Sequence, residues 1–193
     1  MKNNRKTTNA VYLAFFILLA TTSRAQVKSY GFSAGIEYAL STYSAAGPLS
    51  LSGQGIFVQG ERFFSRQHSG KTNTGFSGTL NLGWLHFSGT VYALDSSVQT
   101  RFSVLPLLAG ARYYWKEHYY LAMQAGALVS TNSQTDTHLA LTPGIGMIAP
   151  VGESLLELSL QFTGVPRGFG LPEKTVLQRG GYSFAALRIA YKF

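Results

Sequence analysis

Two runs near the end of the chain have a large apolar or aromatic residue at every second position. Residues 156–163 read LELSLQFT, with an apolar side chain at every even position, and residues 187–193 read LRIAYKF, with an apolar or aromatic side chain at every odd position. Successive side chains of a β-strand point to opposite faces, so each run predicts a strand with one apolar face and one polar face. Such a strand constrains the fold, because its apolar face must be covered by protein or by lipid.

Runs of this kind recur from residue 30 onward, bounded by clusters of Gly, Ser, Asn, Asp and Pro, and no stretch combines a helical apolar period with helix caps. The expected strands are residues 30–42, 53–64, 75–88, 101–115, 118–130, 138–150, 154–164 and 180–193. Each is long enough to cross a bilayer, which takes about 9–11 residues of a tilted strand.

The expected connections alternate in length. Tight turns at 116–117 and 151–153 contrast with long loops at 43–52, 89–100, 131–137 and 165–179, while 65–74 is a long connection at the short-turn end. Short turns at one end and long loops at the other are typical of a transmembrane barrel. The fold class we predict is therefore all-β: an eight-stranded antiparallel up-and-down transmembrane β-barrel.

Charge is scarce, at 12% of residues against roughly 25% in a soluble domain. The charged residues of the strands fall on the polar faces, whereas the apolar faces are almost uncharged. A soluble barrel would have the reverse arrangement, so the apolar faces are expected to meet lipid and the charges to line the lumen. The expected lumen charge network is Glu37, Glu61, Arg112, Glu157, Arg188 and Lys192.

Three details of the strands lead to further expectations. Glu157 and Arg188 lie on neighbouring strands at similar heights and are expected to pair, with Lys192 as the alternative partner if the register is shifted. Residues 105–108 are continuously apolar, but Arg112 predicts that even positions of that strand face inward. The aromatic residues around the turn at 116–117 are expected to form a girdle at the membrane surface; they are Tyr113, Tyr114, Trp115, Tyr119 and Tyr120.

The N-terminus has the pattern of a secretory signal peptide. Lys2, Arg5 and Lys6 precede an apolar run at 10–20, and small residues flank Arg24 before Gln26. The apolar run is too short for a spanning helix. We therefore expect a signal peptide at 1–25, cleaved after Ala25, and a barrel domain at 26–193.

Composition excludes several functional classes. Removing the four basic residues of 1–25 from the total of 16 leaves 12 against 8 acidic residues, so the net charge gives no reason to expect a nucleic-acid partner. The chain has no Cys, which excludes disulfides, thiol nucleophiles and an acylated Cys. The four His residues lack metal-ligand spacing, and we expect neither a metal nor another cofactor.

One pair of residues keeps an enzymatic alternative open. His86 and Ser88 fall on one outward face at the end of an expected strand. The pair resembles the arrangement in outer-membrane lipid A deacylases, where a His activates a Ser hydroxyl. Asp95, the nearest acidic residue, falls in an expected loop, so we expect the chain not to be an enzyme.

The C-terminal run is similar to the signature by which the barrel-assembly machinery recognises its outer-membrane substrates. Its apolar positions are Leu187, Ile189, Tyr191 and Phe193. The segments PLLAGARYYW at 106–115 and YYLAMQAGAL at 119–128 resemble the central hairpin of small eight-stranded outer-membrane β-barrel proteins of Bacteroidota-type bacteria. The resemblance implies an outer-membrane location and a barrel fold, and it implies little about activity.

The lumen of an eight-stranded barrel is just wide enough for side chains to fill. The expected function is therefore that of a monomeric, non-enzymatic integral barrel with a plugged lumen. Its expected partners are outer-membrane lipids, the barrel-assembly machinery and an unknown extracellular ligand. The barrel is expected to act either through its surface loops, which would bind that ligand, or in envelope integrity. A narrow channel for small solutes or ions is the remaining alternative.

Overall fold

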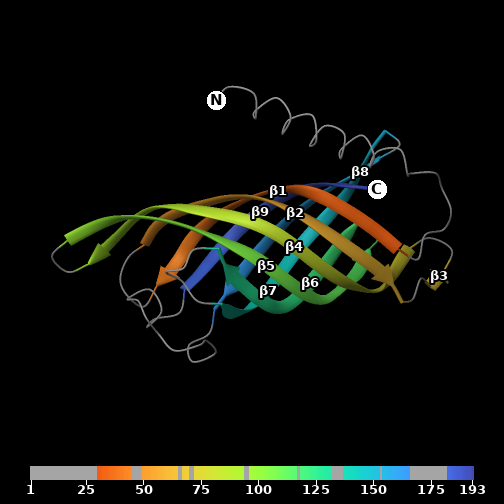
Figure 1. Ribbon diagram of the computed structural model, residues 1–193. Helices are drawn as coiled ribbons and strands as arrows, with labels where there is room; N and C mark the ends of the chain where they lie inside the picture. The colour runs from red at the N-terminus through yellow and green to blue at the C-terminus, as the bar shows by residue number, and fades with distance from the viewer. Residues whose placement is uncertain are drawn as a thin grey trace, which may run out of the picture.

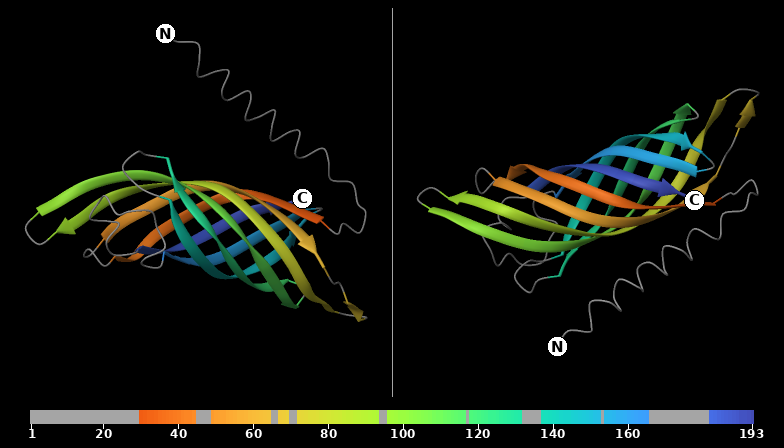
Figure 2. Two further views of the ribbon diagram at one scale, coloured as in Figure 1. Left: turned by 60° about the horizontal axis from the view of Figure 1, so that its bottom comes forward. Right: turned by 90° about the horizontal axis from the view of Figure 1, so that it is seen from above.

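The computed structural model is a closed antiparallel β-barrel of tilted strands (Figures 1 and 2). It describes residues 30–44, 49–64, 67–69, 72–93, 96–116, 118–131, 137–152, 154–165 and 182–193. The expected signal peptide and Gln26 lie outside the described residues. Within those residues, no helix has the length and apolarity needed to cross a membrane.

Eight long strands form the barrel wall. They are β1 (Tyr30–Ser44), β2 (Leu49–Phe63), β4 (Thr72–Ala93), β5 (Ser96–Lys116), β6 (Tyr119–Ser130), β7 (His138–Val151), β8 (Ser154–Gly164) and β9 (Tyr182–Lys192). Their order around the wall is β2-β1-β9-β8-β7-β6-β5-β4, and pairing of β2 with β4 closes it. Every pairing is antiparallel, which confirms the predicted fold class.

The observed strands differ from the expected ones mainly at one hairpin. The expected loop at 89–100 is largely strand, because β4 and β5 continue to pair as far as Ala93 and Ser96. This hairpin extends beyond the neighbouring strands in Figure 1. The reason is local: Thr90 and Val91 are β-branched residues that pair in register with Gln99 and Val98, which outweighs the turn signal of the preceding Ser-Gly.

A short additional strand explains the long connection at 65–74. β3 (Gln67–Ser69) pairs with residues 72–74 of β4. The connection is therefore a small hairpin that prolongs β4 beyond the barrel wall at the short-turn end. We call this end, which holds Tyr30 and Phe193, the terminal end, and the opposite end, which holds Ser44 and Gly164, the loop end.

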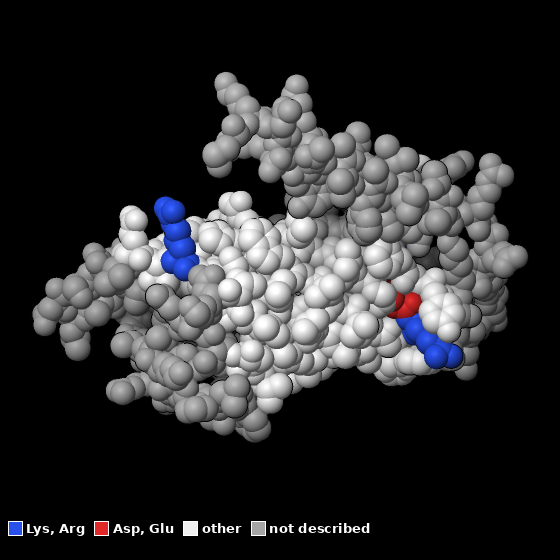
Figure 3. Space-filling view, viewed as in Figure 1, with Lys and Arg blue, Asp and Glu red and all other residues white. Residues whose placement is uncertain are grey.

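The outer wall of the barrel is an apolar band. Large hydrophobic side chains are exposed on every one of the eight wall strands, for example Ile36 (61%), Leu80 (67%) and Met123 (56%). On the face that Figure 3 shows, the described surface between the two ends carries no charged residue. Soluble monomers rarely expose an apolar surface of this extent. The band therefore faces lipid, and the chain is a transmembrane barrel.

The interior has two zones. Toward the terminal end it is filled by polar and charged side chains, whereas toward the loop end it is mostly apolar, with the buried Thr142 and Thr163 hydrogen-bonded beside the apolar side chains. The apolar zone is Ala39, Leu51, Leu85, Phe87, Phe102, Val104, Leu108, Leu128, Ala140, Val165, Phe184 and Ala186. This corrects the expectation of a lumen lined by polar faces alone.

Aromatic rings form the centre of the apolar zone. Phe87 stacks on Phe102, with ring centroids 5.1 Å apart, and meets Phe184 edge-on at 5.2 Å. Gly53 on the neighbouring strand makes room for Phe87, because a Cβ there would lie 2.7 Å from the Phe87 ring. Aromatic side chains therefore pack against one another inside the barrel at its loop end.

The outward orientation of the band yields a prediction. Leu80→Arg places a charge in the middle of the apolar band, so we expect it to destabilise the barrel in lipid by about 2–4 kcal/mol. Val151→Arg is the matched control, because Val151 is similarly exposed (58%) but adjoins the turn residue Gly152 at the terminal end. Its expected cost is about 0–1 kcal/mol. The measurement is equilibrium unfolding in lipid vesicles, and equal costs for the two variants would contradict the assignment.

Candidate functional site

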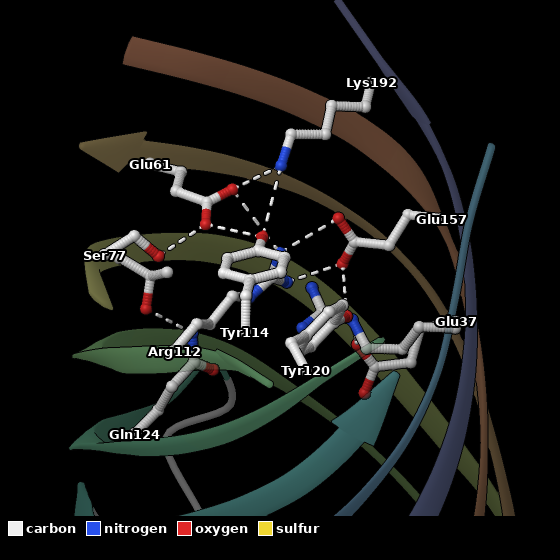
Figure 4. A network of polar contacts seen from close by, with 11 residues as sticks. Glu37, Glu61, Ser77, Arg112, Tyr114, Tyr120, Gln124, Glu157 and Lys192 are labelled. Carbon is white, nitrogen blue, oxygen red and sulfur yellow. Dashed lines mark hydrogen bonds and ion pairs between the residues drawn. The ribbon is translucent and has the colours of Figure 1, made fainter. Parts of the chain in front are cut away.

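The polar zone of the lumen is built around a buried pair of opposite charges. Arg112 of β5 donates two parallel hydrogen bonds to Glu157 of β8, at 3.0 Å from Nη1 to Oε2 and 2.5 Å from Nη2 to Oε1. Both residues are almost completely buried, at 1% and 2% exposure. A bidentate guanidinium–carboxylate pair is the strongest ion-pair geometry available to side chains. It joins strands on different sides of the barrel (Figure 4).

Tyr120 of β6 completes the surroundings of this pair. Its hydroxyl donates to Glu157 Oε1 at 2.7 Å, and its ring lies 4.1 Å from the Arg112 guanidinium carbon. The ring fits because Gly146 faces it from β7, where a Cβ would lie 2.8 Å from ring atom Cε1. The glycine therefore supports the site sterically.

Glu61 of β2 is the second buried carboxylate of the network. It accepts hydrogen bonds from Ser77 Oγ at 2.5 Å and from the Tyr114 hydroxyl at 2.6 Å. Lys192 of β9 forms an ion pair with it, and Arg112 Nη1 lies 3.6 Å from its Oε2. Figure 4 shows these side chains converging on the carboxylate. Six wall strands are thus tied together through two carboxylates.

A third ion pair lies nearer the middle of the barrel. Arg188 Nε of β9 is 3.3 Å from Glu37 Oε2 of β1, and the two residues are direct partners in the strand register. The guanidinium carbon of Arg188 also lies 3.3 Å from the centroid of the Phe57 ring. This pair links the first and last strands of the wall.

The charges of the lumen balance. Among the described residues, every acidic side chain belongs to the network, and the three carboxylates face three cations. The remaining described cations, Arg62, Arg101 and Lys116, are exposed near the ends of the wall. A neutral set of charges is what a narrow, water-poor lumen requires, because an uncompensated buried charge costs several kcal/mol.

The expected pair of Glu157 and Arg188 does not form. In the register Arg188 lies opposite Ser159, and Glu157 lies opposite Ala190. Glu157 instead reaches across the lumen to Arg112, and Arg188 pairs with Glu37 on its other side. Lys192, the expected alternative, pairs with Glu61. The expectation considered only neighbouring strands, whereas long side chains in a narrow lumen also reach strands on other sides.

Two tyrosines of the expected girdle belong to the lumen. Tyr113 and Tyr119 are exposed (40% and 43%), but Tyr114 and Tyr120 are buried (5% and 0%). The alternation that Arg112 establishes on β5 requires this, since Tyr114 is two residues further along the same face. The even position that Tyr114 shares with Arg112 is the sequence signal that places its side chain in the lumen.

On the outer wall, His86 contacts a different serine from the expected one. Its Nδ1 lies 2.8 Å from Ser103 Oγ of β5, which is its partner in the register. Ser88 is two residues further along β4, opposite Arg101. The ring of His86 also stacks on Trp84, with centroids 6.0 Å apart. The histidine–hydroxyl pair is thus formed between two strands, which the spacing of His86 and Ser88 in the sequence does not indicate.

The apolar positions of the C-terminal strand face outward. Leu187, Ile189 and Tyr191 are exposed to between 40% and 47%. Phe193 donates its backbone N–H to the carbonyl of Phe32 at 2.8 Å. These side chains therefore lie in the lipid-facing band. Within the described residues, no cluster of three His, Cys, Asp or Glu could hold a metal ion.

Comparison with known proteins gives distant similarities. No protein-family model matches the chain, and no curated protein does. A structure from the de novo design of transmembrane β-barrels is 14% identical, with a TM-score of 0.43 over 88% of this chain and 100% of that one. The translocator domain of the autotransporter NalP from Neisseria meningitidis is 10% identical, with a TM-score of 0.30 over 98% and 97%. The fold assignment rests on the register and burial of this chain.

The Arg112–Glu157 pair can be tested by a double-mutant cycle. Glu157→Leu leaves the buried Arg112 without its main partner, so we expect it to destabilise the barrel by about 3–5 kcal/mol. Adding Arg112→Leu removes the uncompensated charge and should recover a large part of that loss. The measurement is unfolding in detergent or lipid.

The sequence-based expectation supplies the control for this cycle. Adding Arg188→Leu to Glu157→Leu should give no recovery, because Arg188 has its own partner in Glu37. Recovery by Arg188→Leu and not by Arg112→Leu would show that the pairing is wrong.

Proposed function

We propose that this chain is an integral barrel of a Gram-negative outer membrane, with a lumen closed by its own side chains. In this proposal the barrel acts through its surface loops or through envelope integrity, and not as an open pore. The observation that supports it best is the filling of the lumen at two levels. The charge network closes it toward the terminal end, and the aromatic cluster around Phe87 closes it toward the loop end.

The proposed route to the membrane rests on the two ends of the chain. The signal-peptide pattern at 1–25 supports export, with cleavage after Ala25. The outward row of Leu187, Ile189, Tyr191 and Phe193 supports recognition of β9 by the barrel-assembly machinery. The proposed mature protein is a monomer whose partners are outer-membrane lipids and an extracellular ligand of the loops.

The proposal of a closed lumen predicts that the barrel does not conduct ions. Purified barrel inserted into a planar bilayer should show no stable single-channel conductance, because both zones are packed with side chains. Replacing Phe87, Phe102 and Phe184 together by Ala opens only the apolar zone and leaves the charge network in place, so this variant should also stay closed. Conductance steps from the unmodified barrel would contradict the proposal and favour the narrow-channel alternative.

A second candidate function is hydrolysis of an acyl ester in a membrane lipid. It is supported by the 2.8 Å contact between His86 and Ser103 on the outer wall. His86 would accept the hydroxyl proton as Ser103 Oγ attacks the ester carbonyl, and would return it to the departing alcohol; water would then release the fatty acid. No described acidic side chain faces outward to orient the histidine.

The two candidates differ in one measurement. Lipid A extracted from cells that express the barrel should keep all its acyl chains if the barrel is not an enzyme. Mass spectrometry of the extract makes the comparison. Loss of a chain that Ser103→Ala abolishes and Ser88→Ala does not would establish the hydrolase instead.

A further inference from the structure

Six outward positions near the loop end of β2, β4 and β5 carry polar side chains. The register of β2, β4 and β5 sets them in two adjacent rows. The first row is Gln54, His86 and Ser103, and the second is Ser52, Ser88 and Arg101. We call these six residues the wall patch. The six positions alternate with lumen residues such as Leu85 and Phe87, so they face away from the barrel axis; Ser103 is nevertheless buried (9%), where it contacts His86.

The wall patch begins where the apolar band ends. One step nearer the terminal end, the outward residues are Ile56 and Trp84, exposed to 60% and 45%. Trp84 stacks against His86, and tryptophan is enriched at the boundary between hydrocarbon and head groups. The patch therefore lies at the depth of lipid head groups, with lipid-facing side chains directly below it.

The charge and chemistry of the patch favour an anion. Arg101 is exposed and has no described acidic side chain near it, because all the described carboxylates lie in the lumen. A guanidinium presents parallel N–H groups that match the oxygens of a phosphate. Ser52, Ser88 and Gln54 add neutral hydrogen-bonding groups around it. The bond to Ser103 holds the His86 ring at the centre of the patch.

We propose that the wall patch binds the phosphate-bearing head group of a membrane lipid. Arg101 binds the phosphate, with Ser88 and His86 as further hydrogen-bonding partners, and the acyl chains lie along Ile56, Leu82 and Trp84. The inference rests on the proposed function only in requiring that the barrel be embedded in a membrane. It is independent of whether the lumen conducts.

The chain contains a matched control at the opposite end. Arg62 is also exposed and outward-facing, but it lies over the ring of Tyr30 at 5.5 Å, and its register partners are Tyr30 and Gly78. It therefore has an arginine charge without an adjacent serine or histidine side chain. If charge alone attracted the lipid, Arg62 and Arg101 would contribute equally.

The test measures which lipid stays bound to the purified full-length mature barrel. The barrel in an uncharged detergent is mixed with equal amounts of phosphatidic acid and phosphatidylcholine, and native mass spectrometry counts the retained lipids. The unmodified barrel should retain phosphatidic acid preferentially. Arg101→Gln combined with Ser88→Ala should reduce this preference by about tenfold, the effect of losing a charge-assisted hydrogen bond. Arg62→Gln should leave it unchanged.

Several results would overturn the proposal. The first is equal retention of both lipids by the unmodified barrel. This result is obtained without any variant, so it does not depend on whether a variant folds. Arg62→Gln could weaken retention as much as the wall-patch variant does. Inorganic phosphate could displace the lipid at equal concentration, which would indicate a site for the free anion. Heat-modifiable gel migration confirms the fold of each variant, and a conductance result does not affect this test.

Discussion

The exclusion of unpaired charge from hydrocarbon is the constraint on which this structure depends. The outer wall faces lipid, so the charged side chains of the strands must lie inside or near the ends. Inside a narrow lumen they must also compensate one another. The bidentate pair of Arg112 and Glu157 satisfies that demand across the barrel, and Lys192 with Glu61 and Arg188 with Glu37 satisfy it elsewhere. The register of the wall follows from the same requirement, because a slip of one residue would turn these charges toward lipid.

The two zones of the lumen are occupied by different kinds of side chain. Near the terminal end, hydrogen bonds and ion pairs occupy the space and link strands that are not neighbours. Near the loop end, aromatic rings pack against one another, beside a buried hydrogen bond between Thr142 and Thr163. Glycines facing the rings, Gly53 for Phe87 and Gly146 for Tyr120, let large side chains fit a lumen of this width. Together the zones support the proposal of a closed barrel whose contacts with the environment lie on its outer wall and loops.

Most of the fold could be predicted from the sequence, because period-two alternation is both the signal of a strand and the cause of its orientation. Arg112 alone resolved the facing of the apolar run at 105–108. The hairpin of β4 and β5 was underestimated because a Ser-Gly pair resembles a turn even where β-branched residues continue the strand. The partners within the site were not predictable to the same degree. Contacts such as Arg112 with Glu157, or His86 with Ser103, depend on which strands face or adjoin one another after the barrel closes. The spacing of residues along the sequence does not specify these strand neighbours.

The orientation of the wall can be measured most directly with single cysteines, since the chain has none of its own. Leu80 and Asn81 are adjacent on β4, with exposures of 67% and 3%. A spin label on Leu80→Cys in lipid vesicles should be relaxed strongly by oxygen dissolved in the hydrocarbon. A label on Asn81→Cys, attached before refolding, should be shielded from oxygen or should prevent closure of the barrel. Equal oxygen accessibility at the two positions, or greater accessibility at Asn81, would contradict the account.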